Sequence, residues 1–281
     1  MNRSSFISGL LFGIAMALIA PCTALADSSL STNWAGYAVH RAGVSFRNVS
    51  ATWKQPTADC NTPYATYEAT WVGIGGYNRN SNALEQIGTE LDCNGSGGAR
   101  SAAWYEAVPA PSRRIGMTIR AGDTISATVS VVGRRVTLKI ADRTRHESFS
   151  RQLTVSTVDV RSAEWIVEAP SGCFSDNSCR TLPLTNFGTE SFGAVSATTV
   201  KGRHGSITSS LWGRSKITLA PAGRTFISSG SVGSAAPSAL SQNGSSFLVT
   251  YGRATALAKG AIFAPRAAAG GGAINPGGHR R

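Results

Sequence analysis

The sequence is short of the features that define several common classes of protein. Charged residues make up 15% and aromatic residues 8% of its 281 residues, and no segment beyond the N-terminal region is apolar enough to cross a bilayer. Hydrophobic residues with the 3.6-residue spacing of an amphipathic helix are almost absent. A membrane-spanning protein and a fold rich in helices are therefore not expected.

Motifs of the familiar hydrolases are also missing. The chain has no G-x-S-x-G turn, and the pair His146 and Glu147 is not followed by the second histidine of an H-E-x-x-H zinc site. None of its four histidines lies at metal-ligand spacing from another. No aspartate stands in an Asp-Thr-Gly or Asp-Ser-Gly turn. The sequence gives no support for a serine hydrolase or a paired-aspartate peptidase, and we expect neither a metal nor a cofactor.

The N-terminus has the three parts of a secretory signal peptide. Arg3 supplies the basic start, and Phe6–Ala20 is an apolar stretch too short to span a bilayer comfortably. Residues 24–26 form an A-x-A cleavage pattern. We therefore predict that residues 1–26 are removed after Ala26 and that the protein is secreted to the extracellular or periplasmic space.

Five cysteines are present, and removal of the signal peptide takes away Cys22. The remaining four, Cys60, Cys93, Cys173 and Cys179, can pair in three ways. A short polar stretch between Cys173 and Cys179 is typical of a turn, so we favour that bridge and, with it, Cys60–Cys93. The alternative of free buried thiols is less expected, because an oxidising compartment permits disulfides.

The chain is strongly basic, with a formal net charge of +12 and a sequence pI of about 10.1. Such a charge allows nucleic acid or an anionic surface as a partner. Lys and Arg are scattered along the chain, however, and the only dense basic group is at the C-terminus. We therefore expect a generally basic surface and no specific nucleic-acid site.

Short runs rich in Val, Ile, Thr and aromatic residues alternate with clusters of Gly, Asn, Asp, Ser and Pro, which is typical of strands joined by turns. The clearest hairpin joins Thr124–Val132 to Arg135–Ile140. Further strands are predicted at Val44–Trp53, Tyr67–Ile74, Ala102–Val108, Ala163–Glu168, Gly193–Thr199, Ile207–Leu211 and Ser246–Gly252. This pattern predicts an all-β fold, a sandwich of two antiparallel sheets. We expect one domain over residues 27–253, followed by a flexible Ala/Gly-rich basic tail over 254–281.

One predicted strand carries acids where a strand is usually apolar. Alternation along Ala163–Glu168 places Trp165 and Val167 on one face and Glu164, Ile166 and Glu168 on the other. From this pattern alone, an ordinary amphipathic strand with two solvated glutamates is the favoured interpretation. A cleft with catalytic carboxylates is the alternative.

Five segments, in this order, resemble the motifs of the glutamic peptidases, a family also called eqolisins. They are Asn33–Gly36, Trp71–Ile74, Leu84–Gly88, Ala103–Glu106 and Ala163–Glu168. The resemblance covers roughly residues 31–252. Five ordered motifs are far more specific than any one of them, so the resemblance overturns the interpretation of solvated glutamates. Cys173–Cys179 also looks like the disulfide loop of the family.

The resemblance implies a lectin-like sandwich, similar to a concanavalin-like jelly roll, with a substrate cleft on one sheet. The catalytic pair of the family falls on Gln86 and Glu168. Its groove-lining positions match Trp34, Trp71 and Glu106, with Glu90 where an aspartate is usual. The implied enzyme is a monomeric, secreted acid endopeptidase that acts on polypeptides.

The residue types suit that chemistry. An ionised Glu168 can act as general base on a water held between it and Gln86, and the Gln86 amide can donate to the oxyanion. No covalent intermediate is needed. Because the reference pKa of a glutamate is about 4.3, activity at acidic pH is expected.

Three positions depart from the family pattern, and two other functions stay open. Gly75 and Ala102 stand where the family often has acids, and Val108 replaces an aromatic residue. A lectin-like protein could instead stack sugars on the tryptophans Trp34, Trp71 and Trp104. A glycosidase could use a carboxylate pair such as Glu106 and Glu168.

Overall fold

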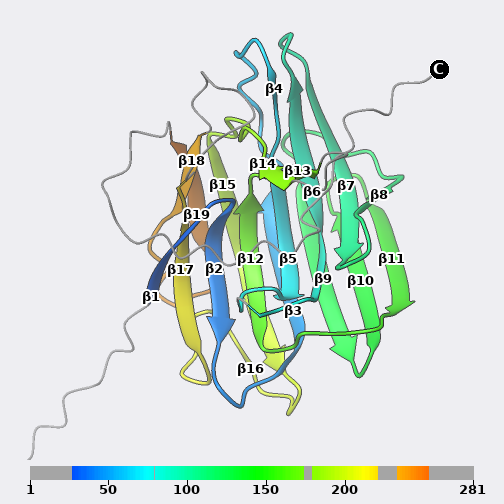
Figure 1. The fold of residues 1–281 in the computed structure, drawn as a ribbon, viewed down its shortest axis with the longest axis vertical. Helices are drawn as coiled ribbons and strands as arrows, with labels where there is room; N and C mark the ends of the chain where they lie inside the picture. Colours follow the sequence, from blue (N-terminus) through cyan, green and yellow to red (C-terminus); the bar gives the residue numbers. More distant parts are fainter. Residues whose placement is uncertain (1–26, 79, 174–178, 221–232, 253–281) are drawn as a thin grey trace, which may run out of the picture.

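The computed structural model describes residues 27–78, 80–173, 179–220 and 233–252 (Figure 1). The predicted signal peptide and the predicted tail lie outside these residues. Within them, every regular element is a strand. The strands are β1 (Asp27–Ser31), β2 (Trp34–His40), β3 (Phe46–Lys54), β4 (Ala65–Thr66), β5 (Ala69–Gly75), β6 (Leu84–Asn94), β7 (Ala99–Ala107), β8 (Arg113–Ile115), β9 (Thr124–Val132), β10 (Arg135–Asp142), β11 (Glu147–Thr154), β12 (Ser162–Glu168), β13 (Ser171–Cys173), β14 (Cys179–Thr181), β15 (Thr189–Thr199), β16 (His204–Gly205), β17 (Gly213–Leu219), β18 (Ser234–Pro237) and β19 (Phe247–Gly252).

The strands form two layers, which we call the front layer and the back layer (Figure 1). The front layer runs in the order β1, β17, β2, β12, β5, β6, β7 and β8. The back layer runs in the order β18, β19, β15, β3, β9, β10 and β11. Apart from the parallel pair β1 and β17, the neighbours in both layers are antiparallel. The predicted two-sheet sandwich is thus confirmed.

The core lies between the two layers and holds the front layer in place. Trp165 of β12 and Ile87 of β6 are fully buried in it, beside Trp53 and Phe192 of the back layer. The indole nitrogen of Trp165 also donates to the carbonyl oxygen of Ser50 at 2.9 Å. Burial of large side chains, each contributing about 1.5–3 kcal/mol, therefore fixes the strand that carries the two glutamates.

The strand predictions hold in most places and fail in one. Strand β9 has the predicted bounds, and β10 runs two residues beyond the predicted Ile140, to Asp142. Ile207–Leu211 is not a strand but a turn, closed by the amide of Ser209 on the carbonyl of Ser206 at 3.1 Å. Its apolar residues misled the prediction, because Ile207 is fully buried as an anchor of this turn in the core.

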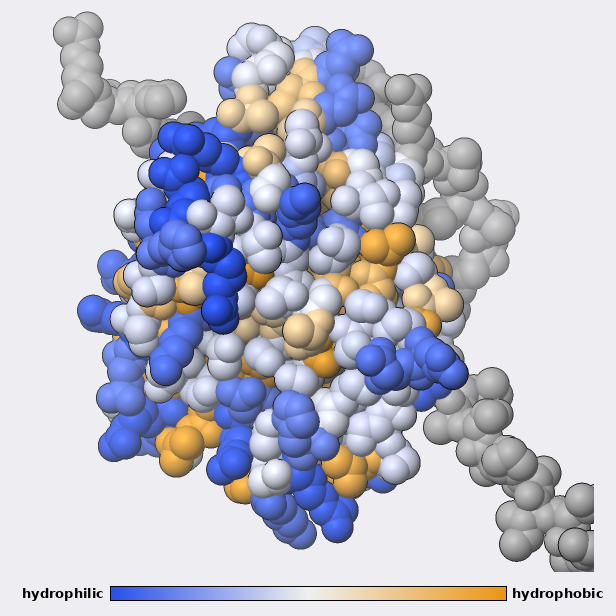
Figure 2. All heavy atoms as spheres, turned by 180° about the vertical axis from the view of Figure 1, so that it is seen from behind, coloured by the Kyte–Doolittle hydropathy of each residue, from blue (hydrophilic) through white to orange (hydrophobic). Residues whose placement is uncertain are grey.

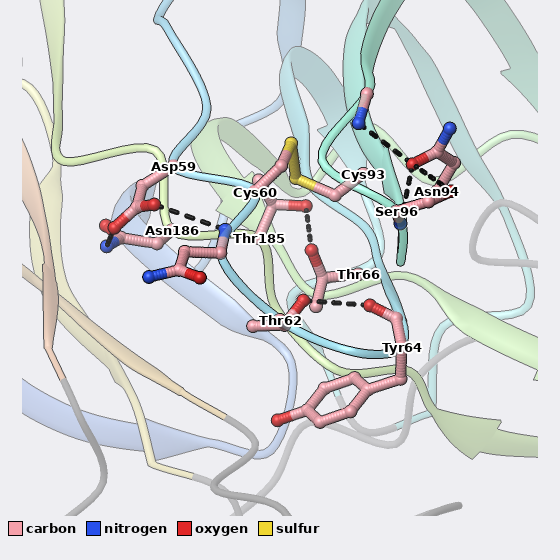
Figure 3. Close-up of a disulfide and its surroundings, with 12 residues drawn as sticks. Asp59, Cys60, Thr62, Tyr64, Thr66, Cys93, Asn94, Ser96, Thr185 and Asn186 are labelled. Atoms are coloured by element: carbon pink, nitrogen blue, oxygen red, sulfur yellow. Dashed lines mark hydrogen bonds between the residues drawn. A yellow bond between two sulfur atoms is a disulfide. The ribbon is translucent and has the colours of Figure 1, made fainter.

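The predicted Cys60–Cys93 disulfide is present and joins the loop before β4 to β6 (Figure 3). Cys179 is also disulfide-bonded. Its backbone lies opposite Cys173 in the two-stranded β13 and β14 ladder, which is the register that the predicted second bridge requires. The side chain of Cys173 lies outside the described residues.

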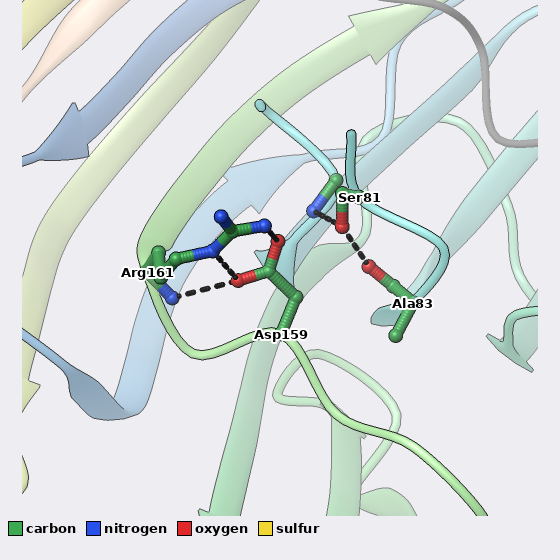
Figure 4. A network of polar contacts seen from close by, with 5 residues as sticks. Ser81, Ala83, Asp159 and Arg161 are labelled. Carbon is green, nitrogen blue, oxygen red and sulfur yellow. Dashed lines mark hydrogen bonds and ion pairs between the residues drawn. The ribbon is translucent and has the colours of Figure 1, made fainter. Parts of the chain in front are cut away.

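A polar network closes the end of the front layer at which β6 and β12 begin (Figure 4). Arg161 donates to both carboxylate oxygens of Asp159 at 2.8 Å, and Ser81 donates to the carbonyl of Ala83 at 2.8 Å. Gly75 packs here with a φ of +91°, and a Cβ on it would lie 2.5 Å from the Asp159 carbonyl oxygen. The acid that the family often has at this position therefore does not fit the local backbone of this chain.

Candidate active site

The outer face of the front layer, turned away from the core, is built from three rows of side chains. Alternate residues of a strand share a face, and the register places them level with one another. The first row holds Ala38, Glu164, Gly73, Gln86 and Glu106, the second Gly36, Ile166, Trp71, Gly88 and Trp104, and the third Trp34, Glu168, Ala69, Glu90 and Ala102. All six site residues predicted from the sequence therefore lie on one face.

The two glutamates of β12 are not solvated. Glu164 is 0% and Glu168 is 2% exposed, so the interpretation of an ordinary amphipathic strand is wrong. The alternation along the strand is confirmed, because Trp165 and Val167 lie in the core and Ile166 packs in a second apolar cluster on the outer face. Burial of carboxyl groups is costly unless they are bonded or protonated, and such groups are enriched at functional sites.

The Glu168 carboxylate is held by one donor on each oxygen. Asn33 Nδ2 donates to Oε1 at 3.0 Å, and Trp71 Nε1 donates to Oε2 at 2.8 Å. Asn33 lies just before β2, where Ser31 Oγ donates to its Oδ1 at 3.2 Å and so orients the amide. Two fixed donors leave the carboxylate with a defined orientation. We did not predict a role for Asn33, although it begins the first of the five motifs.

Burial raises the pKa of Glu168 to about 7. The hydrogen bonds from Trp71 and Asn33, with a smaller contribution from the Trp34 indole, favour the ionised form and hold the pKa below the value that burial alone would give. Trp34 also packs edge-on against Trp71, with ring centroids 5.1 Å apart. The two tryptophans that the resemblance assigned to groove lining are buried beside the carboxylate and favour its ionised form.

Gln86 is held by the neighbouring strand. Its Nε2 donates to Glu106 Oε2 at 2.6 Å, directly across the β6 and β7 register. Its Oε1 is buried and has no hydrogen-bond partner among the described residues. On the other side, β5 presents Gly73, which has no side chain. The amide is thus fixed at one end and open at the other.

Gln86 and Glu168 lie on the same face but make no direct hydrogen bond with each other. Strand β5 runs between their strands, and Trp71 of β5 stands in the row between theirs. Trp104 lies in that same row, and its Nε1 is buried without a partner among the described residues. The face therefore combines hydrogen-bonded carboxylates with one amide oxygen and one indole N–H that lack a partner among the described residues.

Glu90 forms an ion pair that the sequence did not predict. Arg114 of β8 contacts its carboxylate and lies 3.9 Å from Asp92. Burial raises the pKa of Glu90, while the Arg114 guanidinium opposes that shift. Opposite Glu90 stands Ala102, where the family often has an acid. The Arg114 guanidinium thus lies between the carboxylates of Glu90 and Asp92.

Two further buried acids near Gln86 were not predicted to matter. Glu164 lies level with Gln86 across Gly73, and Glu85 precedes Gln86 in β6. The carboxyl oxygens of both are buried without a hydrogen-bond partner among the described residues. Burial raises the pKa of Glu85 to about 8 and that of Glu164 well above its ordinary value. Burial thus favours the protonated form of both carboxyl groups.

The described residues contain no group of three or more His, Cys, Asp or Glu side chains placed to hold a metal ion. Within the same residues, no helix is long and apolar enough to cross a membrane.

Comparisons with known proteins bear on the family and the fold. The sequence model of the Peptidase A4 family matches residues 32–236. A scytalido-glutamic peptidase solved with a transition state analog inhibitor is 24% identical, with a TM-score of 0.62 over 78% of this chain and 98% of that chain. SCP-B, a member of the eqolisin family solved with a tripeptide, is 22% identical, with a TM-score of 0.53 over the same shares. No curated protein sequence matches the chain.

The fold is shared with solved glutamic peptidases. The chain belongs to the Peptidase A4 family, the eqolisins. Its class is therefore that of the glutamic endopeptidases. The sequence had left two alternatives open, a lectin-like protein and a glycosidase, and membership in a peptidase family favours neither of them.

Proposed function

We propose that this enzyme is exported and cleaves peptide bonds in polypeptides with a water activated by Glu168 and Gln86. The observation that carries the proposal is the Glu168 carboxylate, buried and fixed by two donors on the same face as Gln86. A carboxylate held in this way can accept a proton from a water without moving itself.

The reaction follows from the groups present. Ionised Glu168 takes a proton as the oxygen of the water attacks the peptide carbonyl carbon, and the charge develops on the carbonyl oxygen. Glu106 engages one N–H of the Gln86 amide, so the other N–H is available to donate to that oxyanion. The protonated Glu168 then gives its proton to the amine nitrogen as the carbon–nitrogen bond breaks, and no acyl-enzyme forms.

The pH range of this reaction follows from the state of the base. Glu168 must be ionised to act, and burial raises its pKa to about 7. The base form is therefore a minority at pH 5 and is fully present only above neutrality. We propose that activity rises with pH through about 7, in place of the acidic optimum that the reference pKa of a glutamate suggests.

The dyad is tested by isosteric substitution. In Glu168→Gln we expect kcat to fall by about 10²–10⁴-fold, the usual contribution of general acid–base catalysis. In Gln86→Ala we expect a loss of about 10²–10³-fold, as for other oxyanion donors. The measurement is kcat on a quenched fluorescent peptide, with circular dichroism to confirm folding. Glu147→Gln, on the exposed strand β11, is the matched control. A folded Glu168→Gln enzyme with full activity would refute the assignment.

Export is proposed from the predicted signal peptide and is consistent with the Cys60–Cys93 disulfide, since such bridges persist in oxidising compartments. N-terminal sequencing of protein recovered from a bacterial periplasm or medium should begin at Asp27. A chain that retains Met1 and stays inside the cell would contradict the proposal.

A further inference from the structure

At one flank of the sandwich, β7 and β8 of the front layer lie in front of β11 of the back layer (Figure 1). Residues of these strands line a groove where the edges of the two layers face each other. It consists of two adjoining hollows that share Tyr105, Arg113 and Arg151. Their volumes are about 660 Å³ and about 540 Å³. Seen from behind, this flank is mostly hydrophilic (Figure 2, left side). We refer to the two hollows together as the flank groove.

The flank groove carries positive charge and no negative charge. Arg113, Arg114 and Arg151 line it, and no Asp or Glu does. Arg114 is engaged by Glu90, whereas Arg113 and Arg151 are exposed and make no ion pair in the described part of the chain. Glu147, which shares a face of β11 with Arg151, is paired with Arg145. Two guanidinium groups are therefore available to an incoming anion.

The floor and walls of the flank groove are apolar. Tyr105 of β7 and Phe149 of β11 stack across the gap between the layers, with ring centroids 5.8 Å apart and an interplanar angle of 21°. Further apolar lining residues include Val108, Pro109, Pro111, Leu153 and Val155. An occupant that fits this surface must carry both carboxylates and apolar side chains, which is a property of an acidic peptide and not of a simple anion.

Both strands that border the flank groove are edge strands in the described part of the chain. β8 pairs with β7, and β11 pairs with β10, with no partner on the other side of either. An unpaired strand edge offers its backbone N–H and C=O groups to an added extended segment. The surface therefore suits a peptide in extended conformation, in which alternate side chains would reach the arginines.

The flank groove is continuous with the outer face that holds the active site. Val108 packs with Trp104 and Leu84 on that face and also lines the groove. Only Ala107, itself a lining residue, separates Val108 from Glu106, the partner of Gln86. A polypeptide bound at the active site can thus continue around the edge of β7 into the groove.

We propose that the flank groove binds an acidic, extended segment of the polypeptide substrate, outside the bond that is cleaved, and so directs this enzyme to acidic substrates. The inference rests on the proposed peptidase function and adds the class of substrate. It assigns to Arg113 and Arg151 the role of specificity-determining residues, not of catalytic ones.

The test compares two peptides with the same cleaved segment, one extended by alternating Glu and Val and the other by alternating Gln and Val, with the extension placed on either end. Two exposed ion pairs would form with the acidic peptide, so we expect its kcat/KM to exceed that of the neutral peptide by about twofold to thirtyfold. In R113A/R151A this preference should vanish while activity on the neutral peptide is unchanged. R113E/R151E should prefer a Lys-extended peptide.

The matched control is K201A/R203A, which removes the same charge from the exposed turn between β15 and β16. It should keep the preference, and an equal loss there would show that only net charge matters and overturn the proposal. So would a preference that survives in R113A/R151A. Binding of an uncleavable Glu-extended peptide, followed by fluorescence anisotropy, tests the groove even if no peptide is cleaved. If heparin binds more tightly than that peptide and the double variant abolishes it, the occupant is an anionic polymer and the peptide assignment is wrong.

Discussion

The two faces of β12 are equally buried, but one carries apolar side chains and the other carries carboxyl groups. Trp165 and Val167 on the inner face join the apolar core between the layers. Glu164 and Glu168 on the outer face are as deeply buried, yet they place carboxyl groups where only Glu168 finds donors. The inner face stabilises the fold. The outer face costs stability, because desolvated carboxyl groups are retained for chemistry.

The largest effect on stability should come from the inner face. Trp165→Ala removes a fully buried indole and its hydrogen bond to Ser50, so we expect the free energy of unfolding to fall by about 3–5 kcal/mol. Urea denaturation followed by tryptophan fluorescence measures it. A loss smaller than about 1 kcal/mol would show that the two faces do not divide stability and chemistry in this way.

A second comparison concerns pH, because many buried carboxyls lack a basic partner. Burial raises the pKa of Glu68 and of Glu85 to about 8 and raises that of Glu164 well above its ordinary value. A carboxyl with a raised folded-state pKa binds its proton more tightly in the folded protein than in the unfolded chain. The stabilisation that these groups contribute to the folded state is therefore complete below about pH 4.5, their ordinary pKa. It is lost as the pH rises through about 8.

Thermal unfolding between pH 5 and pH 9 checks this sign. We expect the midpoint to fall steadily over that range, and the fall to be smaller in Glu85→Gln/Glu164→Gln, which cannot ionise. Glu147→Gln removes an exposed carboxyl and should leave the slope as it is in the parent protein. A midpoint that rises toward pH 9 would contradict the burial of neutral carboxyls.

The smallest predicted effect comes from comparing an indole hydrogen bond on the outer face with one in the core. Trp71→Phe keeps a ring on the outer face but removes the N–H that favours ionised Glu168, so the pKa of Glu168 should rise above about 7. The acid limb of the kcat profile should move to higher pH by a fraction of a unit. Stability should fall by about 1 kcal/mol, the usual worth of one hydrogen bond.

Trp53→Phe is the matched change on the inner side, because Trp53 Nε1 donates to Thr89 Oγ1 at 3.0 Å within the core. It should lower stability by a similar amount and leave the pH profile unmoved. A shift of the profile in both variants would mean that the profile reports folding and not the titration of Glu168.

The sequence predicted the fold through local signals that the structure retains. Alternation defined β9 and the two faces of β12, since one face of each strand is apolar. It missed β11, whose sequence ESFSRQLT is mostly polar because this edge strand is largely exposed. It also read Ile207–Leu211 as a strand, because a buried turn residue and a strand residue are equally apolar.

The site was predictable only in part. The residues of the outer face came from ordered motifs, and the register confirms that they lie together. The contacts of Arg114 with Glu90 and of Asn33 with Glu168 join elements far apart in the chain, so no local pattern could reveal them. The raised pKa of Glu168 depends on burial, which the alternation of a strand does not give.

The Cys60–Cys93 disulfide has a consequence for the way in which the active site can come apart. The two cysteines are 33 residues apart, and the chain between them contains β5 together with most of β6, and so both Trp71 and Gln86. This hairpin is therefore a covalently closed ring. When the rest of the sandwich opens, the ring limits how far the two strands can separate, so the glutamine and its tryptophan neighbour remain tethered while Glu168 is free to leave.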